Sequence, residues 1–120
     1  MVNGMNILFI CSANVNRSKG FEREFKKLLK DQKVEVRSAG IYSYCGTGYK
    51  LDDKILQWAD KVFVMTQGHK MFIHKAYNAY LDKVFVVGIS DEYDVDDEAL
   101  NIIAKYWYET VFMVKHYRKV

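Results

Sequence analysis

Cysteine is scarce in this sequence of 120 residues, which contains only Cys11 and Cys45. Two cysteines do not make a disulfide framework, and they do not supply a four-ligand zinc site. The three histidines, His69, His74 and His116, are too scattered to form a metal site, and we expect them at the surface. The sequence therefore predicts no metal centre.

Long apolar runs and a targeting segment are also missing. No apolar stretch approaches the length of a membrane span, and residues 1–6 lack the basic start and apolar core of a signal peptide. The formal net charge of +3 suits an anionic substrate but is too small for a nucleic-acid-binding surface. We therefore expect a cytoplasmic protein with no membrane or nucleic-acid partner.

Half of the residues are hydrophobic, and the length suits one domain over residues 1–120. Strands are expected at 6–10, 34–38, 62–65 and 84–87, the first and third of buried type, and helices at 18–30, 51–58, 68–80 and 96–116. The third helix has three apolar residues in step, Phe72, Ala76 and Tyr80. The last helix has one apolar face, formed by Leu100, Ile103, Trp107, Val111 and Val114. This alternation predicts an α/β fold, a three-layer sandwich whose four-stranded parallel sheet carries helices on both faces.

The most informative stretch begins where the first predicted strand ends, at Cys11. Arg17 follows as the sixth residue after it, and Ser18 opens a helical pattern and is suited to cap it. A loop this short can turn its backbone N–H groups toward one point, beside the start of the helix, and bind an anion. Cys11 is then the nucleophile, Arg17 binds two phosphate oxygens, and the Ser18 hydroxyl favours the thiolate. The predicted phosphate-binding residues are consecutive: Ser12, Ala13, Asn14, Val15, Asn16, Arg17 and Ser18.

The bare spacing is also compatible with a buried strand cysteine and a solvated arginine. Two features favour the anion site. Cys11 ends its strand instead of lying in the middle of it, and a cation such as Arg17 is disfavoured at a helix N-terminus unless an anion lies between them. Right-handed crossovers would also place Cys11, Ser38, Thr66 and Asp91, which follow the four strands, along one edge of the sheet.

The pattern L-F-I-C-x-x-N-x-x-R-S at residues 8–18 resembles the phosphate-binding loop of the low-molecular-weight protein tyrosine phosphatases. Residues 38–40 (Ser-Ala-Gly) and 58–65 resemble further parts of that family. Residues 91–93 (Asp-Glu-Tyr) stand where the family carries Asp-Pro-aromatic, and its compact members share Asp-Glu-Tyr. The resemblance extends from about residue 5 to about residue 114.

The resemblance implies a phosphatase that acts on phosphotyrosine in proteins or on small aryl phosphates, without a cofactor. Cys11 would form a phosphocysteine, Arg17 would stabilise the transferring phosphoryl group, and Asp91 would be the general acid. Three tyrosines are candidates for the wall of an aromatic pocket, Tyr93, Tyr42 and Tyr44. For Tyr42 and Tyr44, ordinary amphipathic packing is an equal alternative.

The chain departs from the family pattern at four positions, one of them near Ala13, where the family usually has glycine. Asn16 stands where many members carry a second cysteine, which protects the nucleophile. Lys19 and Glu92 stand where the family has prolines, and this sequence contains no proline. Glu92 brings a second carboxylate, so it is an alternative to Asp91 as the acid.

Three other functions share this kind of loop. An arsenate reductase needs a downstream cysteine pair, and this chain offers only Cys45. The phosphocysteine carriers of sugar transport lack the arginine and the downstream acid. A non-catalytic phosphate-binding regulator is an alternative that the changes at Lys19 and Glu92 leave open.

Overall fold

Four parallel strands form one sheet in the computed structural model, which describes residues 4–12, 17–42, 49–89 and 97–116. The strands are β1 (Met5–Cys11), β2 (Val34–Gly40), β3 (Lys61–Val64) and β4 (Val84–Val86). Their order across the sheet is β2-β1-β3-β4, and every neighbouring pair is parallel. The predicted sheet is therefore confirmed, with β1 between two partners.

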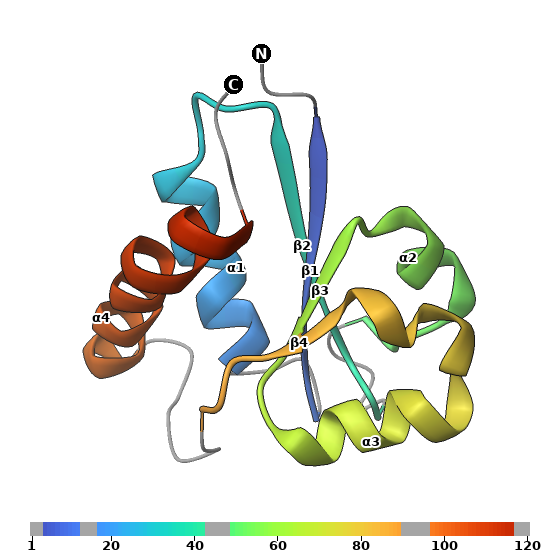
Figure 1. Cartoon of the computed structure of the whole chain (residues 1–120). Coiled ribbons are helices and arrows are strands. Elements are labelled where there is room, and N and C mark those ends of the chain that lie inside the picture. The colour runs from blue at the N-terminus through green and yellow to red at the C-terminus, as the bar shows by residue number, and fades with distance from the viewer. Residues whose placement is uncertain (1–3, 13–16, 43–48, 90–96, 117–120) are drawn as a thin grey trace.

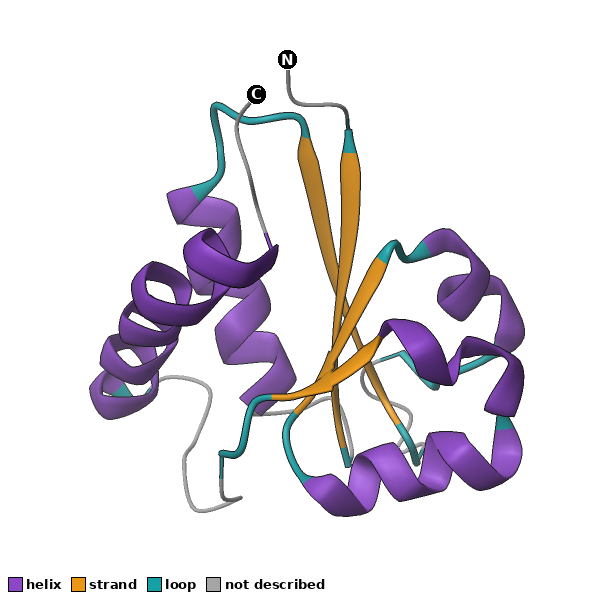
Figure 2. Cartoon of the chain, in the orientation of Figure 1, coloured by secondary structure: helices purple, strands orange, loops and turns teal. Residues whose placement is uncertain are grey.

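Helices cover both faces of this sheet (Figure 1). α1 (Arg17–Leu28) and α4 (Glu98–Trp107) lie on one face, and α2 (Asp53–Trp58) and α3 (Gln67–Ala76) lie on the other. Figure 2 shows the same three layers, with the strands between the two groups of helices. The predicted α/β sandwich is confirmed. Within the described ranges, no helix has both the length and the apolar character needed to cross a membrane.

The core has two halves because successive side chains of β1 point to opposite faces of the sheet. Ile7, Phe9 and Cys11 pack into a cluster with residues of α1 and α4. Leu8 and Ile10 pack into a second cluster with residues of α2 and α3. β1 is therefore apolar on both faces, as a strand covered on each side by helices must be.

Phe9 connects the strand that ends at Cys11 to the helix that follows it. Its ring centroid lies 5.4 Å from that of Phe21 and 4.8 Å from that of Phe25, both in α1. The Phe63 ring of β3 lies 5.6 Å away on the same face. These tilted and edge-on contacts fix α1 against β1, so the end of the strand and the start of the helix hold a defined relative position.

The strand order changes direction at β1, because β2 lies on one side of it and β3 and β4 lie on the other. Doubly wound sheets bind ligands at the carboxyl ends of the strands beside such a reversal. Cys11 is the last residue of β1, and Thr66 comes two residues after the end of β3. The fold therefore places the predicted site at the edge where sheets of this kind bind ligands.

The third helix ends earlier than predicted. α3 stops at Ala76, and a 3₁₀ segment, η1 (Asn78–Lys83), replaces the predicted last turn. Ala76 is exposed, so the predicted apolar face is wrong at this residue. The buried residues of α3 are instead His69 and Ile73, which lie one helical turn apart.

The last helix changes its period midway. Its N-cap is Asp97, and after Trp107 it continues as a π-helix, η2 (Tyr108–His116). A π-helix bonds residue i to i+5, so its turns are wider than those of an α-helix. Phe112 therefore follows Trp107 into the core and is fully buried, whereas Val114 is 62% exposed. The prediction that Val114 shares the buried face is wrong for this reason.

Replacing Phe112 by alanine should lower the free energy of unfolding by about 3–5 kcal/mol, the usual loss for a fully buried phenylalanine. Val114→Ala is the matched control and should change it by less than about 0.5 kcal/mol, because the side chain is exposed. Urea denaturation followed by tryptophan fluorescence measures both values. A greater loss for Val114→Ala than for Phe112→Ala would contradict the π-helical register.

Candidate active site

The end of β1 and the start of α1 bring a thiol and a hydroxyl into contact. Cys11 is 3% exposed, Ser18 is fully buried, and Cys11 Sγ lies 2.9 Å from Ser18 Oγ. The prediction that Ser18 is the N-cap is wrong, because the helix begins one residue earlier, at Arg17. The other predicted role agrees with the geometry, since the hydroxyl is positioned to donate to a thiolate.

Arg17 is buried, although it is the first residue of a helix. It is 5% exposed, and its Nη1 donates to the backbone carbonyl oxygen of Ile89 at 2.8 Å. The ion pairs formed between described residues do not include Arg17. The alternative of a solvated arginine is therefore wrong, and the residue brings a buried positive charge to the edge of the sheet. A buried positive charge is stable only when it is paired, so an anion that binds beside Arg17 would be favoured.

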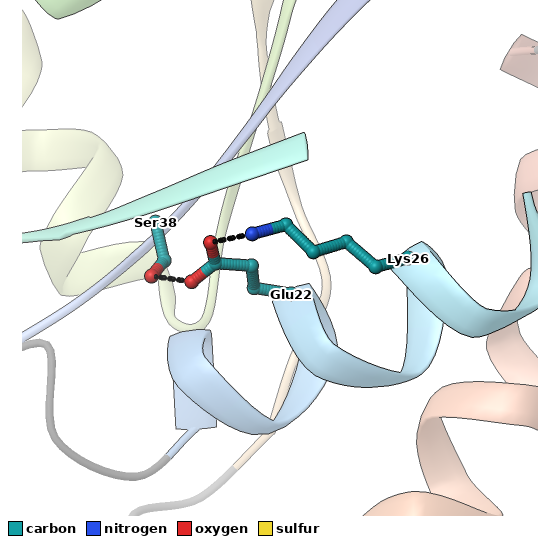
Figure 3. A network of polar contacts seen from close by, with 3 residues as sticks. All are labelled: Glu22, Lys26 and Ser38. Carbon is teal, nitrogen blue, oxygen red and sulfur yellow. Dashed lines mark hydrogen bonds and ion pairs between the residues drawn. The ribbon is translucent and has the colours of Figure 1, made fainter. Parts of the chain in front are cut away.

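Ser38 fastens the end of β2 to α1 through a carboxylate (Figure 3). The Ser38 hydroxyl donates to Glu22 Oε1, and Lys26 Nζ forms an ion pair with Glu22 Oε2 at 2.7 Å. Glu22 and Lys26 are four residues apart in α1, so their side chains lie on the same face of the helix. Because both carboxylate oxygens are engaged, the negative charge of Glu22 is partly balanced within α1 and β2.

The backbone of residues 41 and 42 runs along the end of β1. The Ile41 N–H donates to the Cys11 carbonyl oxygen at 3.0 Å, and the Tyr42 N–H donates to the Ser12 carbonyl oxygen at 2.8 Å. Tyr42 is 63% exposed. It borders an open hollow of about 470 Å³ with Ser12 and His69. Tyr42 is therefore next to the predicted phosphate-binding loop, and its ring is not packed into the core.

His69 is buried, so the expectation that all three histidines lie at the surface is wrong. It is 6% exposed, and its Nε2 lies 3.0 Å from Ser12 Oγ. Its Nδ1 accepts a hydrogen bond from the Thr66 N–H, while the Thr66 hydroxyl accepts one from the His69 N–H. These reciprocal bonds form a capping box at the start of α3. The available sequence signal was the threonine three residues before a histidine, directly after a strand.

Burial, together with the smaller effect of the positive charge of Arg17, lowers the pKa of His69 from 6.5 to about 4. The ring is therefore neutral near pH 7. Among the residues that the structure describes, no three His, Cys, Asp or Glu side chains gather to hold a metal ion. The described polar groups near the end of β1 are a cysteine sulfur, hydroxyls, a neutral imidazole and the guanidinium of Arg17, which suit an anion.

The remaining predicted site residues lie outside the described ranges. They are Ala13, Asn14, Val15 and Asn16 of the loop, Tyr44 of the pocket, and Asp91, Glu92 and Tyr93 of the segment after β4. Cys45 also lies outside these ranges. The roles predicted for these residues stay predictions.

Comparison with known proteins gives a family match over most of the chain. A family model described as low molecular weight phosphotyrosine protein phosphatase matches residues 6–117. The protein-arginine-phosphatase of Bacillus subtilis (strain 168) is 29% identical over 105 residues, which cover 69% of this chain and 70% of that protein. The chain is thus similar in sequence to a phosphatase whose named substrate differs from that of the family model.

Solved structures of phosphatases share the fold. A low molecular weight protein tyrosine phosphatase from T. tengcongensis has a TM-score of 0.72 and 23% identity, covering 86% of this chain and 92% of that chain. The arginine phosphatase YwlE, as a cysteine-to-serine mutant with a phosphorylated active-site serine, has a TM-score of 0.67 and 23% identity. That match covers 89% of this chain and 98% of that chain.

The lowered pKa of His69 predicts a loss of stability in acid. Between pH 6.5 and about 4 the unfolded histidine binds a proton that the folded one does not, so the free energy of unfolding falls as the pH falls through this window. The loss from this group is about 3 kcal/mol at most. His69→Gln should flatten the pH dependence, as measured by urea denaturation from pH 7 to pH 4.

His74→Gln is the control for this measurement, because His74 is exposed on the same helix. Its pH dependence should match that of the wild type. If His69→Gln and the wild type lost stability in parallel over this range, the buried neutral state of His69 would be refuted.

Proposed function

Because the chain belongs to the low-molecular-weight phosphotyrosine protein phosphatase family, we propose that it hydrolyses phosphorylated protein residues with Cys11 as the nucleophile. The observation that carries the proposal is the 2.9 Å contact between Cys11 Sγ and Ser18 Oγ, beside the buried Arg17. A hydroxyl donor at the sulfur and a cation at the helix start both favour the thiolate, which is the reactive form.

The reaction has two steps. The Cys11 thiolate attacks phosphorus in line with the leaving group, so an S–P bond forms while the bond to the leaving group breaks and its electron pair departs with it. Water then attacks the phosphocysteine, the S–P bond breaks, and inorganic phosphate is released from the regenerated thiolate. Arg17 binds phosphoryl oxygens in both steps and stabilises the charge that spreads over them. No metal or cofactor takes part.

A phosphocysteine intermediate is supported by the chemistry of a structural relative. YwlE, described as an arginine phosphatase, has been obtained as a cysteine-to-serine mutant with a phosphorylated active-site serine. A phosphoryl group on that serine is what attack by an active-site side chain on phosphorus would leave behind. We assign the corresponding role in this chain to Cys11.

We assign the role of general acid, which protonates the leaving group, to Asp91. Arg17 Nη1 donates to the Ile89 carbonyl oxygen at 2.8 Å, and Ile89 precedes Asp91 by two positions in the sequence. This bond ties the segment after β4 to the predicted phosphate-binding residues, which supports an acid from that segment. Glu92 is the alternative acid from the same segment.

The substrates that we favour are phosphotyrosine in proteins and small aryl phosphates. Tyr42 is 63% exposed, and its backbone is bonded to Ser12, so its ring is available to contact an aromatic leaving group. Tyr44 and Tyr93 are the other residues proposed for this pocket. A non-catalytic phosphate-binding regulator is the alternative that uses the same loop without turnover.

Phosphoarginine is the second candidate, because the relative from Bacillus subtilis is named a protein-arginine-phosphatase. The same thiolate would then break a P–N bond instead of a P–O bond. The departing guanidine nitrogen also needs a proton, so Asp91 would have the same role. The two substrates differ in what the pocket must contact, an aryl ring or a planar guanidine group.

Peptides of one sequence that carry either phosphotyrosine or phosphoarginine separate the two candidates. We expect faster phosphate release from phosphotyrosine, because an exposed tyrosine lies beside the loop. Cys11→Ser should reduce turnover of both peptides by at least ~100-fold, the low end for loss of a catalytic group, while phosphate binding persists. Faster phosphate release from the phosphoarginine peptide would reverse the substrate assignment. If Cys11→Ser kept more than about a hundredth of the wild-type turnover, the covalent mechanism would be excluded.

Asp91→Asn tests the acid and Glu92→Gln is its matched control. Loss of a positioned acid should slow phosphotyrosine hydrolysis by roughly 10²–10⁴-fold. The rate of hydrolysis of a nitrophenyl ester should fall clearly less in this variant, because nitrophenolate is a weaker base and leaves without being protonated. Steady-state rates on both substrates give the comparison. If Glu92→Gln showed the leaving-group-dependent loss and Asp91→Asn did not, Glu92 would be the acid.

A further inference from the structure

His69 is a buried titratable side chain that has no role in the proposed mechanism. It lies in the first turn of α3, after β3, whereas Ser12 directly follows Cys11 at the end of β1. The hydrogen bond between His69 Nε2 and Ser12 Oγ, at 3.0 Å, therefore joins the end of β1 to the helix that follows the neighbouring strand β3. It connects α3 to the first residue after the nucleophile.

The hydrogen bonds of the ring fix which nitrogen carries the proton. The backbone N–H of Thr66 can only donate, so Nδ1, at 3.2 Å from it, is an acceptor. In a neutral imidazole the proton is then on Nε2. The Nε2–H consequently donates to Ser12 Oγ, and the Ser12 hydroxyl is the acceptor in this bond.

Ser12 is thus held from two directions. Its hydroxyl oxygen accepts from His69, and its carbonyl oxygen accepts from the Tyr42 N–H at 2.8 Å. A serine hydroxyl has one proton to donate besides its acceptor lone pairs. Because His69 occupies the oxygen as a donor, the hydroxyl proton of Ser12 is left for another acceptor.

The two edges of the imidazole have separable tasks. The capping box needs only Nδ1, because that atom accepts from Thr66. The Nε2 edge adds nothing to the cap and contacts Ser12. A role of His69 in helix capping alone therefore does not account for its hydrogen bond to Ser12.

We propose that His69 is a positioning residue that holds the Ser12 hydroxyl as an acceptor, so that the hydroxyl proton donates to an oxygen of the bound phosphoryl group. The inference rests on the proposed function, because it takes the residues after Cys11 to bind that group. The same bond fixes the chain direction as it leaves Cys11. His69 itself does not contact the substrate.

A double-mutant cycle between the two residues tests the proposal. The variants are His69→Gln, Ser12→Ala and the pair together, and Gln is chosen because it is a natural capping-box residue and retains an acceptor for the Thr66 N–H. Ser12→Thr keeps a hydroxyl and serves as the conservative variant. His74→Gln, exposed on the same helix, is the control.

Two readouts are needed, one with turnover and one without. The first is kcat/KM for nitrophenyl phosphate. The second is the concentration of inorganic phosphate that halves the rate of alkylation of Cys11 by iodoacetate, which reports anion binding alone. Since Ser12→Ala leaves the cap of α3 in place, a loss in that variant cannot be attributed to a failed helix start.

We expect His69→Gln and Ser12→Ala each to reduce kcat/KM and phosphate affinity by about tenfold, the fold-change that one ordinary hydrogen bond is worth. The double variant should be no worse than Ser12→Ala. Ser12→Thr should lose less of both properties than Ser12→Ala does, because it keeps a hydroxyl, and it should stay sensitive to His69→Gln. His74→Gln should match the wild type.

The proposal is overturned if His69→Gln causes the same fold-loss in the Ser12→Ala background as in the wild type, because His69 then does not act through Ser12. It is also overturned if Ser12→Ala leaves phosphate affinity unchanged. Failure of the proposed function looks different: the wild type would hydrolyse no phosphate ester, or Cys11→Ser would retain turnover. The alkylation readout would still measure the coupling between the two residues in that case.

Discussion

The pairing of β1 with a strand on each side is the constraint on which the candidate site depends. Near its end the Met65 N–H donates to the Ile10 carbonyl oxygen and the Ile41 N–H to the Cys11 carbonyl oxygen, each at 3.0 Å. A shift of the register by one residue would turn every side chain of the strand to the other face. Cys11 would then leave the face that packs against α1, and its sulfur would lose Ser18.

The groups at this edge of the sheet also have a distribution of charge that suits an anion. Among the described residues at this edge of the sheet, Arg17 is a buried cation, the Ser12 and Ser18 hydroxyls and the His69 ring are neutral, and the Cys11 sulfur is the group that we propose as a thiolate. The nearby carboxylate of Glu22 has both oxygens engaged by Ser38 and Lys26. A phosphoryl group entering this site would therefore meet donors and one positive charge, without an unbalanced carboxylate among these residues.

Much of the fold and part of the site follow from local sequence. The strands β1, β3 and β4 are short apolar runs, and the contact between Cys11 and Ser18 lies within one strand–loop–helix unit, so a single stretch of sequence contains it. The contact between Ser12 and His69 joins residues 57 apart, and no local pattern pairs them. A histidine in the middle of a polar stretch gives no sign of burial until the capping box is recognised.

The π-helix η2 could not be predicted from the sequence, for a different reason. Apolar residues are dense over this segment, so the same stretch fits an α-helical face through Val111 and Val114 or a wider turn through Phe112. Which fits is decided by how well the large Phe112 ring packs against Phe25 and Phe63, with centroids at 5.1 and 6.0 Å. Periodicity does not contain that tertiary preference.

The claim that Cys11 itself carries the phosphoryl group is tested most directly by trapping the intermediate. Wild-type protein is mixed with excess nitrophenyl phosphate, quenched in acid within the first turnover, digested and analysed by mass spectrometry. The account predicts a phosphoryl adduct on the peptide that contains Cys11, together with a burst of nitrophenolate stoichiometric with the protein whenever hydrolysis of the adduct is the slower step. Turnover without any adduct on that peptide would contradict it.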